Sequence, residues 1–398
     1  MKQIYQDYMI FLKAFVQGTA PELSDTTALP QILNMARIHS TAGIIGYVMM
    51  SCPGFVDAEF QAFMRKQCLS EVALYSRRAE QMKELIRQMN DCGIDHLLFK
   101  GYIVRDYYRV PELRTFGDID FVIRKSDRQK SDELMKSLGF EVHENWEPVF
   151  SYLKGTEYYE IHTDVMEVDV SDKADYKGYY SHIWEHAVQS NDPERPHTYE
   201  FTPEFHFLYL LTHIAKHISS SGAGIRMYMD IAFFIEHFGD GIDWKWISLE
   251  LEKLQLQEFS NFVLNAVEQW FGIVSPLPLR AVSDEVLDDF LEFTLEGGTY
   301  GKVGREKSLI FLKQQNRNEE KVSRIRTLLF HIFPPAANLE NRYSYLQGRH
   351  WLLPAAWIHR LIGNRDSWGR YVHNAKSIVN TDSEEVKKLK RIYREIGL

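Results

Sequence analysis

The sequence predicts an α+β protein in which a small mixed β-sheet, backed by helices, lies between two helical regions. Apolar residues recur at steps of three and four over residues 70–90, which is the spacing of an amphipathic helix. Between residues 91 and 190, short apolar runs bounded by turn residues alternate with helical patterns, and this order favours a mixed sheet. A proline-containing turn-rich stretch at 191–196 then precedes a return of helical periodicity. We therefore expect a helical region at 1–90, a mixed-sheet core at 91–190 and a mainly helical region at 191–398.

The core contains four expected strands, each short and rich in apolar, β-branched or aromatic residues, at 94–99, 118–123, 140–143 and 157–165. Lys100-Gly101 breaks the first strand, and a short helix follows it. Between the second and third strands, Ser126 and Gln129 have the spacing of a capping box at a helix start. Gly139 stands where a left-handed residue would end that helix.

The C-terminal region begins with a helix start at Thr202-Pro203, since proline suits the first helical position. A helix over 205–218 is separated by a glycine-containing turn, 222–224, from another helix over 226–238. This turn allows the second helix to fold back on the first. Polar side chains of both helices are then expected to face the mixed-sheet core.

The bulk composition excludes several classes of protein. The chain has 398 residues with a formal net charge of −9 and no dominant basic stripe, so we expect no binding to long nucleic acid. Its three cysteines match neither a disulfide framework nor a zinc motif, which favours a reducing, cytoplasmic compartment. The N-terminus does not have the pattern of a signal peptide, and no apolar run of about 18 residues predicts a membrane span.

Asp118 and Asp120 are the first candidate site residues. They are two apart on an expected strand, so both carboxylates point to one face while Ile119 points into apolar packing. Two like charges side by side are unfavourable unless a cation lies between them, and hard oxygen ligands suit Mg²⁺. Gly117, directly before the pair, allows a ligand to approach the backbone closely. The alternative is a purely structural pair, because exposed strands often carry this pattern.

Two neighbouring segments favour the metal interpretation. Upstream, the helix after Lys100-Gly101 follows a glycine, and such a helix N-terminus is a site for phosphate. Downstream, Glu160, His162 and Asp164 alternate along an expected strand and therefore share a face. A phosphate site, paired carboxylates and a third carboxylate on a neighbouring strand are what two-metal phosphoryl transfer needs.

These blocks resemble the uncharacterised bacterial nucleotidyltransferase family of the polymerase-beta-type superfamily. The resemblance rests on Phe99-Lys100-Gly101, Tyr107-Tyr108, Pro111, Arg114, Gly117-Asp118-Ile119-Asp120-Phe121-Val122 and Tyr159-Glu160-Ile161-His162. The C-terminal region is also similar, at His213, Lys216, His217, Arg226, Asp230 and Ile242-Asp243-Trp244. The resemblance covers about residues 30–350.

The resemblance implies a role for each matching residue. Asp118, Asp120 and Glu160 would be the catalytic residues and would hold two Mg²⁺ ions, with Mn²⁺ as an alternative. Gly101 would be the glycine of the phosphate loop. Many superfamily members have a serine in this loop that touches phosphate, and here Lys100 would supply the charge instead. The nucleotide would also be bound by Arg114, Gly117, His162, His213, Lys216 and Asp230.

Some of these residues have alternatives. His213 and His217 have a helical spacing that can bind zinc, although the lysine beside them would repel a cation. Arg226 and Asp230 have the spacing of a helical ion pair. Arg114 can clamp a phosphate or can hold its own loop through backbone carbonyls.

The sequence thus predicts an enzyme that transfers a nucleoside monophosphate from a nucleoside triphosphate to an unknown hydroxyl-bearing acceptor and releases pyrophosphate. The acceptor is a small molecule or a macromolecule such as a protein or a tRNA end. The alternative function is a nucleotide-sensing or partner-binding module without turnover, which the altered phosphate loop motivates.

Overall fold

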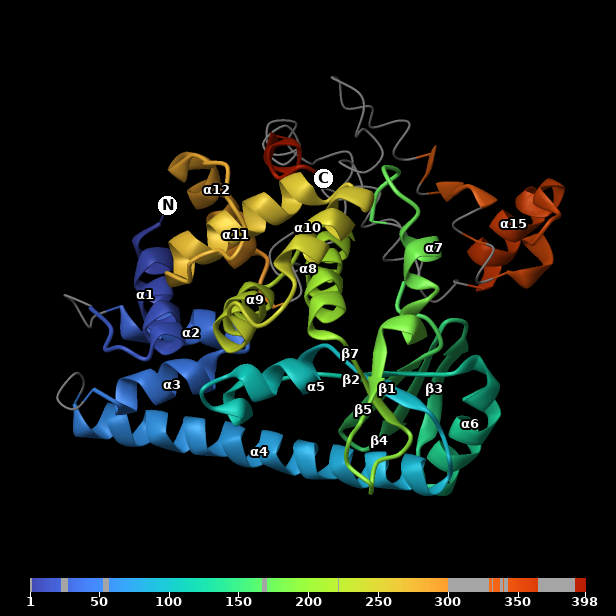
Figure 1. The fold of residues 1–398 in the computed structure, drawn as a ribbon, viewed down its shortest axis with the longest axis horizontal. Helices are drawn as coiled ribbons and strands as arrows, with labels where there is room; N and C mark the ends of the chain where they lie inside the picture. Colours follow the sequence, from blue (N-terminus) through green and yellow to red (C-terminus); the bar gives the residue numbers. More distant parts are fainter. Residues whose placement is uncertain are drawn as a thin grey trace.

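The structure is a computed structural model that describes residues 2–22, 28–52, 57–166, 170–220, 222–299, 329–330, 332–336, 339, 343–363 and 391–398. Figure 1 shows a β-sheet with one long helix, α4, along one side and a group of helices on the other. The α+β class with a mixed sheet, as the sequence predicts, is confirmed.

Seven strands of the described chain form one sheet in the order β3-β4-β5-β2-β1-β7-β6. The strands are β1 (His96–Leu98), β2 (Ile119–Ile123), β3 (Glu141–Trp146), β4 (Val149–Lys154), β5 (Glu157–His162), β6 (Ala187–Gln189) and β7 (Thr198–Phe201). The pairs β2–β5 and β1–β7 are parallel, whereas the other neighbours are antiparallel. The sheet is therefore mixed.

Strands β1, β2, β3 and β5 correspond to the four expected runs, with shifted ends. Strand β3 continues to Trp146, and β5 ends at His162 instead of residue 165. Strand β4 and the β6–β7 hairpin were not expected. The stretch 191–196 joins β6 to β7, so the sheet extends beyond residue 190 to Phe201. Turn residues such as those of this stretch serve hairpin loops as well as linkers, and composition alone does not separate the two.

Helices precede, interrupt and follow the sheet. The N-terminal ones are α1 (Gln3–Gln17), α2 (Leu29–Ile38), α3 (Ala42–Met50) and α4 (Ala58–Asp91). Within the core lie α5 (Gly101–Val104), α6 (Arg128–Ser137) and α7 (Tyr176–Tyr180). After the sheet come α8 (Pro203–Ser220), α9 (Ile225–Phe238), α10 (Trp244–Lys253), α11 (Gln257–Phe271), α12 (Asp284–Glu296) and α15 (Leu353–Gly363).

The capping box expected at the start of α6 is wrong. Ser126 lies inside a 3₁₀ turn, Lys125–Asp127, that runs directly into the helix, and no side chain caps the first turn. Because Ser126 already has turn geometry, its hydroxyl does not sit at the helix entrance. The side chain of Gln129 instead donates to Glu133 Oε1 at 2.9 Å.

One face of the sheet packs on α4 and α6. Ile119, Phe121 and Ile123 alternate along β2 and are buried in one apolar cluster with residues of both helices. Strand alternation then turns Asp120 and Val122 to the opposite face. Val122 belongs to a different apolar cluster, which includes buried residues of α8 and α9. The opposite face of the sheet is therefore the one that the C-terminal helices cover.

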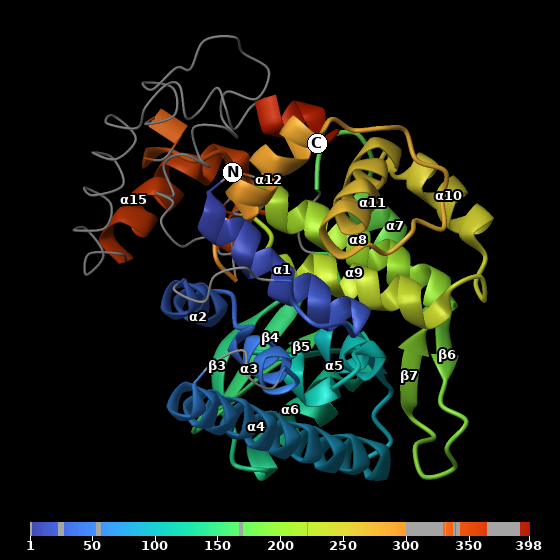
Figure 2. The same ribbon diagram turned by 90° about the vertical axis from the view of Figure 1, so that its left-hand side faces the viewer.

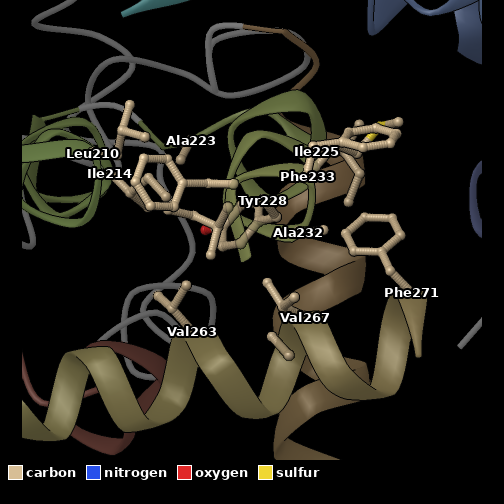
Figure 3. Close-up of a cluster of buried hydrophobic side chains, with 14 of the residues drawn as sticks. Leu210, Ile214, Ala223, Ile225, Tyr228, Ala232, Phe233, Val263, Val267 and Phe271 are labelled. Atoms are coloured by element: carbon tan, nitrogen blue, oxygen red, sulfur yellow. The ribbon is translucent and has the colours of Figure 1, made fainter. Parts of the chain in front are cut away.

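The C-terminal helices have a common core, shown in Figure 3. Leu210 and Ile214 of α8 approach Tyr228 of α9, and Val263 and Val267 of α11 lie below them (Figure 3). Helix α1 packs against both α9 and α11, so a helix that precedes the sheet shares this core with helices that follow it (Figure 2). In the described part of the chain, no helix is both long and apolar enough to span a bilayer.

Candidate active site

A cavity of about 270 Å³ lies between the sheet and helices α8 and α9. It is lined by all eleven site residues that the sequence predicts, namely Lys100, Gly101, Arg114, Gly117, Asp118, Asp120, Glu160, His162, His213, Lys216 and Asp230. These residues come from segments more than a hundred positions apart, and the fold brings them together.

The parallel pairing of β2 with β5 brings two carboxylates together. Asp120 and Glu160 are direct partners in the strand register, so their side chains stand next to each other on the same face. The sequence predicts that Asp118 begins the strand. In the structure it lies instead in a bend just before β2. It nevertheless lines the same cavity. The adjacency of Asp120 and Glu160 thus follows from strand register.

Asp120 is held by two basic side chains. Lys100 Nζ donates to Asp120 Oδ1 at 2.8 Å, and His162 Nε2 lies 2.8 Å from the same oxygen. Burial raises the pKa of Asp120, but Lys100 and then His162 outweigh it, and the net pKa lies below the ordinary value. Asp120 is therefore ionised across the neutral pH range.

The two other carboxylates have the opposite shift. Burial, and after it repulsion by Asp120 and Asp118, raise the pKa of Glu160 to about 7. Burial and repulsion by Asp120 also raise the pKa of Asp118, although Lys100 partly offsets them. The three carboxylates thus disfavour one another's ionised forms, and a cation bound between them would favour ionisation.

Three side chains are close enough to share one metal ion. Ligand atoms of Asp120, Glu160 and His162 all lie within 4.8 Å of one another, and this is the only such group among the described residues. The sequence interpretation placed Asp118 in this set and gave His162 to the nucleotide. Two carboxylates suit Mg²⁺ or Mn²⁺, and imidazole is an acceptable further ligand for a transition metal. The donor set therefore fits a divalent ion.

Asp164 does not share the face of Glu160. Strand β5 ends at His162, and the Asp164 carboxylate accepts a hydrogen bond from the Met166 backbone N–H at 3.2 Å. The sequence predicts that Asp164 shares a face with Glu160 because the expected strand continues to residue 165. In the structure, the alternation ends at His162, two residues before Asp164. Asp164 is also absent from the lining of the cavity.

Gly101 has a structural reason to be glycine. A Cβ atom added there would lie 2.4 Å from Arg114 Nη1, closer than real contacts allow. The helix that begins at Gly101 is four residues long. The glycine therefore makes room for a guanidinium group, which is a requirement distinct from the phosphate contact that the resemblance implies.

Arg114 holds its own loop, which is one of the two alternatives left open by the sequence. Its Nε and Nη2 donate to the two carboxylate oxygens of Asp230 at 3.1 and 2.6 Å, and its Nη1 donates to the Thr115 carbonyl at 2.9 Å. Tyr108 OH also donates to Asp230 Oδ1 at 2.7 Å. The Asp230 carboxylate is thus engaged with Arg114, and it positions this arginine at the edge of the cavity.

Arg226 contacts the same loop from α9. Its Nη1 donates to both the carbonyl and the hydroxyl of Thr115. From α4, Arg78 Nη1 donates to the Phe116 carbonyl at 2.6 Å. The helical ion pair considered for Arg226 and Asp230 is therefore replaced by separate contacts to Thr115 and Arg114. Arginines from three segments fix the two residues that precede Gly117.

The α8 face of the cavity contains His213, Lys216 and His217. His213 Nε2 lies 3.1 Å from His217 Nε2. Burial, followed by repulsion from His217 and Lys100, lowers the pKa of His213 well below its ordinary value. Neither histidine belongs to a group of three metal donors among the described residues, which disfavours the zinc alternative.

Several lining residues were not predicted. The wall contains the apolar side chains of Phe116, Val165, Leu210, Ile214 and Met227, and also Thr299. Thr299 follows α12, and its hydroxyl donates to the Ile38 carbonyl at 2.7 Å. These residues are apolar or isolated in the sequence, and such residues usually pack in a core, so no local pattern marks them as cavity residues.

Adjacent carboxylates beside a cavity on a mixed sheet suit metal-assisted phosphoryl chemistry. The model of a family described as uncharacterised nucleotidyltransferase matches residues 25–272, and the chain belongs to this family. A comparison with curated proteins found no significant match. Among solved structures, the antibiotic-resistance factor ANT(2'')-Ia is similar, with 11% identity, a TM-score of 0.33, and 45% of this chain and 92% of that chain covered.

Proposed function

We propose that this protein transfers a nucleoside monophosphate from a nucleoside triphosphate to a hydroxyl-bearing acceptor and releases pyrophosphate. One observation carries the proposal: Asp120 and Glu160 are register partners on β2 and β5, in a cavity that Asp118 and Lys216 also line. The family match supports transfer of a nucleotidyl group in general. The metal, the nucleotide and the acceptor are our inference.

Asp118, Asp120 and Glu160 would hold two Mg²⁺ ions, and Mn²⁺ is the alternative. His162 is an additional candidate ligand, since its ring nitrogen lies within reach of the same position. Bound metal supplies the positive charge that polarises the α-phosphate and stabilises the leaving pyrophosphate. The negative charge that these residues gather in a buried cavity fits such an ion.

Asp120 and Glu160 are the two candidates for the general base that takes the proton of the acceptor hydroxyl, and Glu160 is the stronger base. Its pKa is raised to about 7 in the metal-free protein, and although a bound divalent ion would lower the pKa of either carboxyl, Glu160 starts from the higher value. Asp120 has a lowered pKa and is the weaker base. Glu160 would therefore take the proton of the acceptor hydroxyl as the hydroxyl oxygen approaches the α-phosphorus.

The cationic side of the cavity would hold the triphosphate. Lys216 of α8 and Lys100, which contacts Asp120, supply this positive charge, whereas His213, whose pKa burial lowers well below the ordinary value, would offer an uncharged imidazole. The apolar wall that includes Leu210 and Ile214 offers a surface on which a base or an apolar part of the acceptor can pack. We expect a reducing, cytoplasmic setting, because Cys52, Cys68 and Cys92 are all free thiols.

The proposal is tested by incubating the protein with Mg²⁺, a cell metabolite extract and each of the four nucleoside triphosphates labelled at the α-phosphate. We expect one labelled product together with release of pyrophosphate, both abolished by EDTA. Asp120→Asn should abolish both signals. The matched control is Asp164→Asn, which removes a nearby carboxylate that does not line the cavity, and it should keep the activity.

The alternative of a nucleotide-sensing module gives a different result. Magnesium-dependent binding of a nucleoside triphosphate, without labelled product or pyrophosphate for any extract, would favour sensing over transfer. Activity that survives both EDTA and Asp120→Asn would contradict the metal-dependent mechanism.

A further inference from the structure

Lys100 has an unusual backbone conformation for a residue with a side chain. Its φ is 55° and its ψ is −140°, a region in which few residues other than glycine are found. This conformation places Nζ 2.8 Å from Asp120 Oδ1 and 5.0 Å from the ring centre of Phe99. Strain of this kind persists where the surroundings fix it, and it is concentrated at functional sites.

The ammonium lies where a metal ion would also have to lie. The Lys100 side chain is 17% exposed and the Asp120 side chain is 10% exposed, so water screens this pair weakly. An ion shared by Asp120, Glu160 and His162 would be confined by ligand atoms that lie within 4.8 Å of one another. That ion would therefore be close to the ammonium, and the two cations would repel each other.

We propose that Lys100 is the counter-cation of Asp120 in the metal-free site, and that it must leave Asp120 for a divalent ion to bind tightly. This inference rests on the proposed function. A nucleoside triphosphate in the same cavity gives the displaced ammonium a new partner, because its phosphates carry negative charge that the carboxylates and the metal do not neutralise. Metal and nucleotide then bind cooperatively, and each raises the affinity of the other by the same factor.

The charge balance supports this order of events. The ammonium offsets one of the three carboxylate charges of Asp118, Asp120 and Glu160, so the empty cavity already has part of its negative charge neutralised. Metal without nucleotide must compete with Lys100 for this charge. Metal that arrives with a triphosphate brings its own counter-charge, and the lysine moves from a carboxylate to a phosphate.

The test measures Mn²⁺ binding, with free Mn²⁺ followed by electron paramagnetic resonance, in the absence and presence of α,β-methylene analogues of ATP, GTP, CTP and UTP. Wild-type protein should bind Mn²⁺ weakly alone and at least about tenfold more tightly with the preferred analogue. Lys100→Met should bind Mn²⁺ alone about tenfold more tightly than wild type, and the analogue should add little. Lys100→Arg keeps a cation and should remain close to wild type.

Two further variants control this experiment. Lys100→Gly removes the ammonium and also relieves the backbone strain, so it replaces Lys100→Met if that variant does not fold. Lys83→Met removes an exposed lysine that pairs with Glu80, and its Mn²⁺ affinity should equal that of wild type. If Lys100→Met and Lys100→Gly both bind Mn²⁺ no more tightly than wild type, the inference is overturned while the metal site stands. If wild-type protein binds no Mn²⁺ with or without analogue, the proposed function fails as well.

Discussion

At the residue scale, the two aspartates of the Asp118-x-Asp120 pair have different environments. Asp120 is held by Lys100 and His162, and its pKa is lowered. Asp118 has a raised pKa, because burial and the charge of Asp120 both disfavour its ionised form. The site thus contains one carboxylate that is already neutralised and others that repel each other until a cation binds.

Asp118→Asn is expected to abolish Mg²⁺-dependent activity while leaving the fold intact. The substitution removes an anionic ligand but keeps the shape of the side chain. It also relieves repulsion between carboxylates, so the melting temperature measured in EDTA should not fall and should rise slightly. Turnover and thermal unfolding of the same preparation check both statements, and full turnover would rule out a catalytic Asp118.

Lys216→Ala should weaken nucleotide binding more than it lowers the melting temperature. Lys216 lies on the cavity face of α8 and is partly exposed, so its loss leaves no cavity in the core. The side chain would contribute one cation to the triphosphate, and a charge-assisted contact is worth about 1.5–3 kcal/mol. Calorimetric titration with a non-hydrolysable analogue measures this change. Unchanged affinity would confine the nucleotide site to the sheet side of the cavity.

The three carboxylates expected from the sequence all line the cavity, whereas several partners of the polar residues around them were not expected. Alternation along a strand is a local property, so the face that Asp120 or Glu160 takes follows from its own short segment, whereas the register that pairs them does not. The pairing of Arg114 with Asp230 joins residues 116 positions apart in sequence. No local pattern marks such a pair, and the position of Asp230 was expected to serve the nucleotide instead. Thr299 also lines the cavity and contacts a distant residue, Ile38, and no local pattern marks it.

At the element scale, the loop before β2 depends on three different segments. Arg78 of α4, Arg114 of the loop itself and Arg226 of α9 all donate to the carbonyls of Thr115 or Phe116. These carbonyls precede the carboxylate pair by two or three residues. The position of Asp118 is therefore determined by helices on both sides of the sheet.

Asp230→Asn should destabilise the protein strongly, because it leaves the Arg114 guanidinium buried without its anion. The two side chains are 12% and 5% exposed, and breaking a buried pair in this way costs about 3–5 kcal/mol. Urea unfolding measures the change. The double variant Arg114→Met with Asp230→Leu removes both charges and should recover part of the loss. If Asp230→Asn has the same urea midpoint as the wild-type protein, the pair contributes little to stability.

The strands that the sequence did not predict, β4, β6 and β7, are short and are defined by their neighbours in the sheet. Strand β4 is buried throughout Val149-Phe150-Ser151-Tyr152 and includes a serine, and such a short run lacks a period that identifies it. Strands β6 and β7 are three and four residues long; β7 pairs with β1, and β6 pairs with β7. Strands that are set by their neighbours in the sheet cannot be recognised from their own residues.

At the scale of the whole molecule, several buried histidines make stability depend on pH. His39, His96 and His206 are all buried, and burial lowers the pKa of each to about 4. In the unfolded chain these groups titrate near 6.5, so between about pH 6.5 and pH 4 the unfolded state binds more protons than the folded state. The free energy of unfolding therefore falls as the pH is lowered through this window.

Urea unfolding in EDTA should show a lower midpoint at pH 5 than at pH 7.5, with each histidine contributing at most about 3 kcal/mol across the full window. Glu160 and Asp118 act in the opposite sense, since their raised pKa values favour the folded state at low pH, whereas the lowered pKa of His213 adds to the effect of the three histidines. His206→Leu should reduce the difference between the two pH values. The exposed His182→Gln is the control and should leave it unchanged, and a midpoint that is higher at pH 5 would contradict the prediction.

The β6–β7 hairpin has a consequence for protein engineering. Strand β7 pairs with β1 and leads directly into α8, which contributes His213, Lys216 and His217 to the cavity. A hybrid protein that takes the region from residue 191 onward from a relative therefore also takes the relative's β7. If the crossover is made near residue 190, the donor's strand must fit the recipient's β1, whereas a crossover after Phe201 keeps every strand native. Junctions placed after Phe201 should give folded hybrids in which acceptor preference can be exchanged while the carboxylates stay fixed.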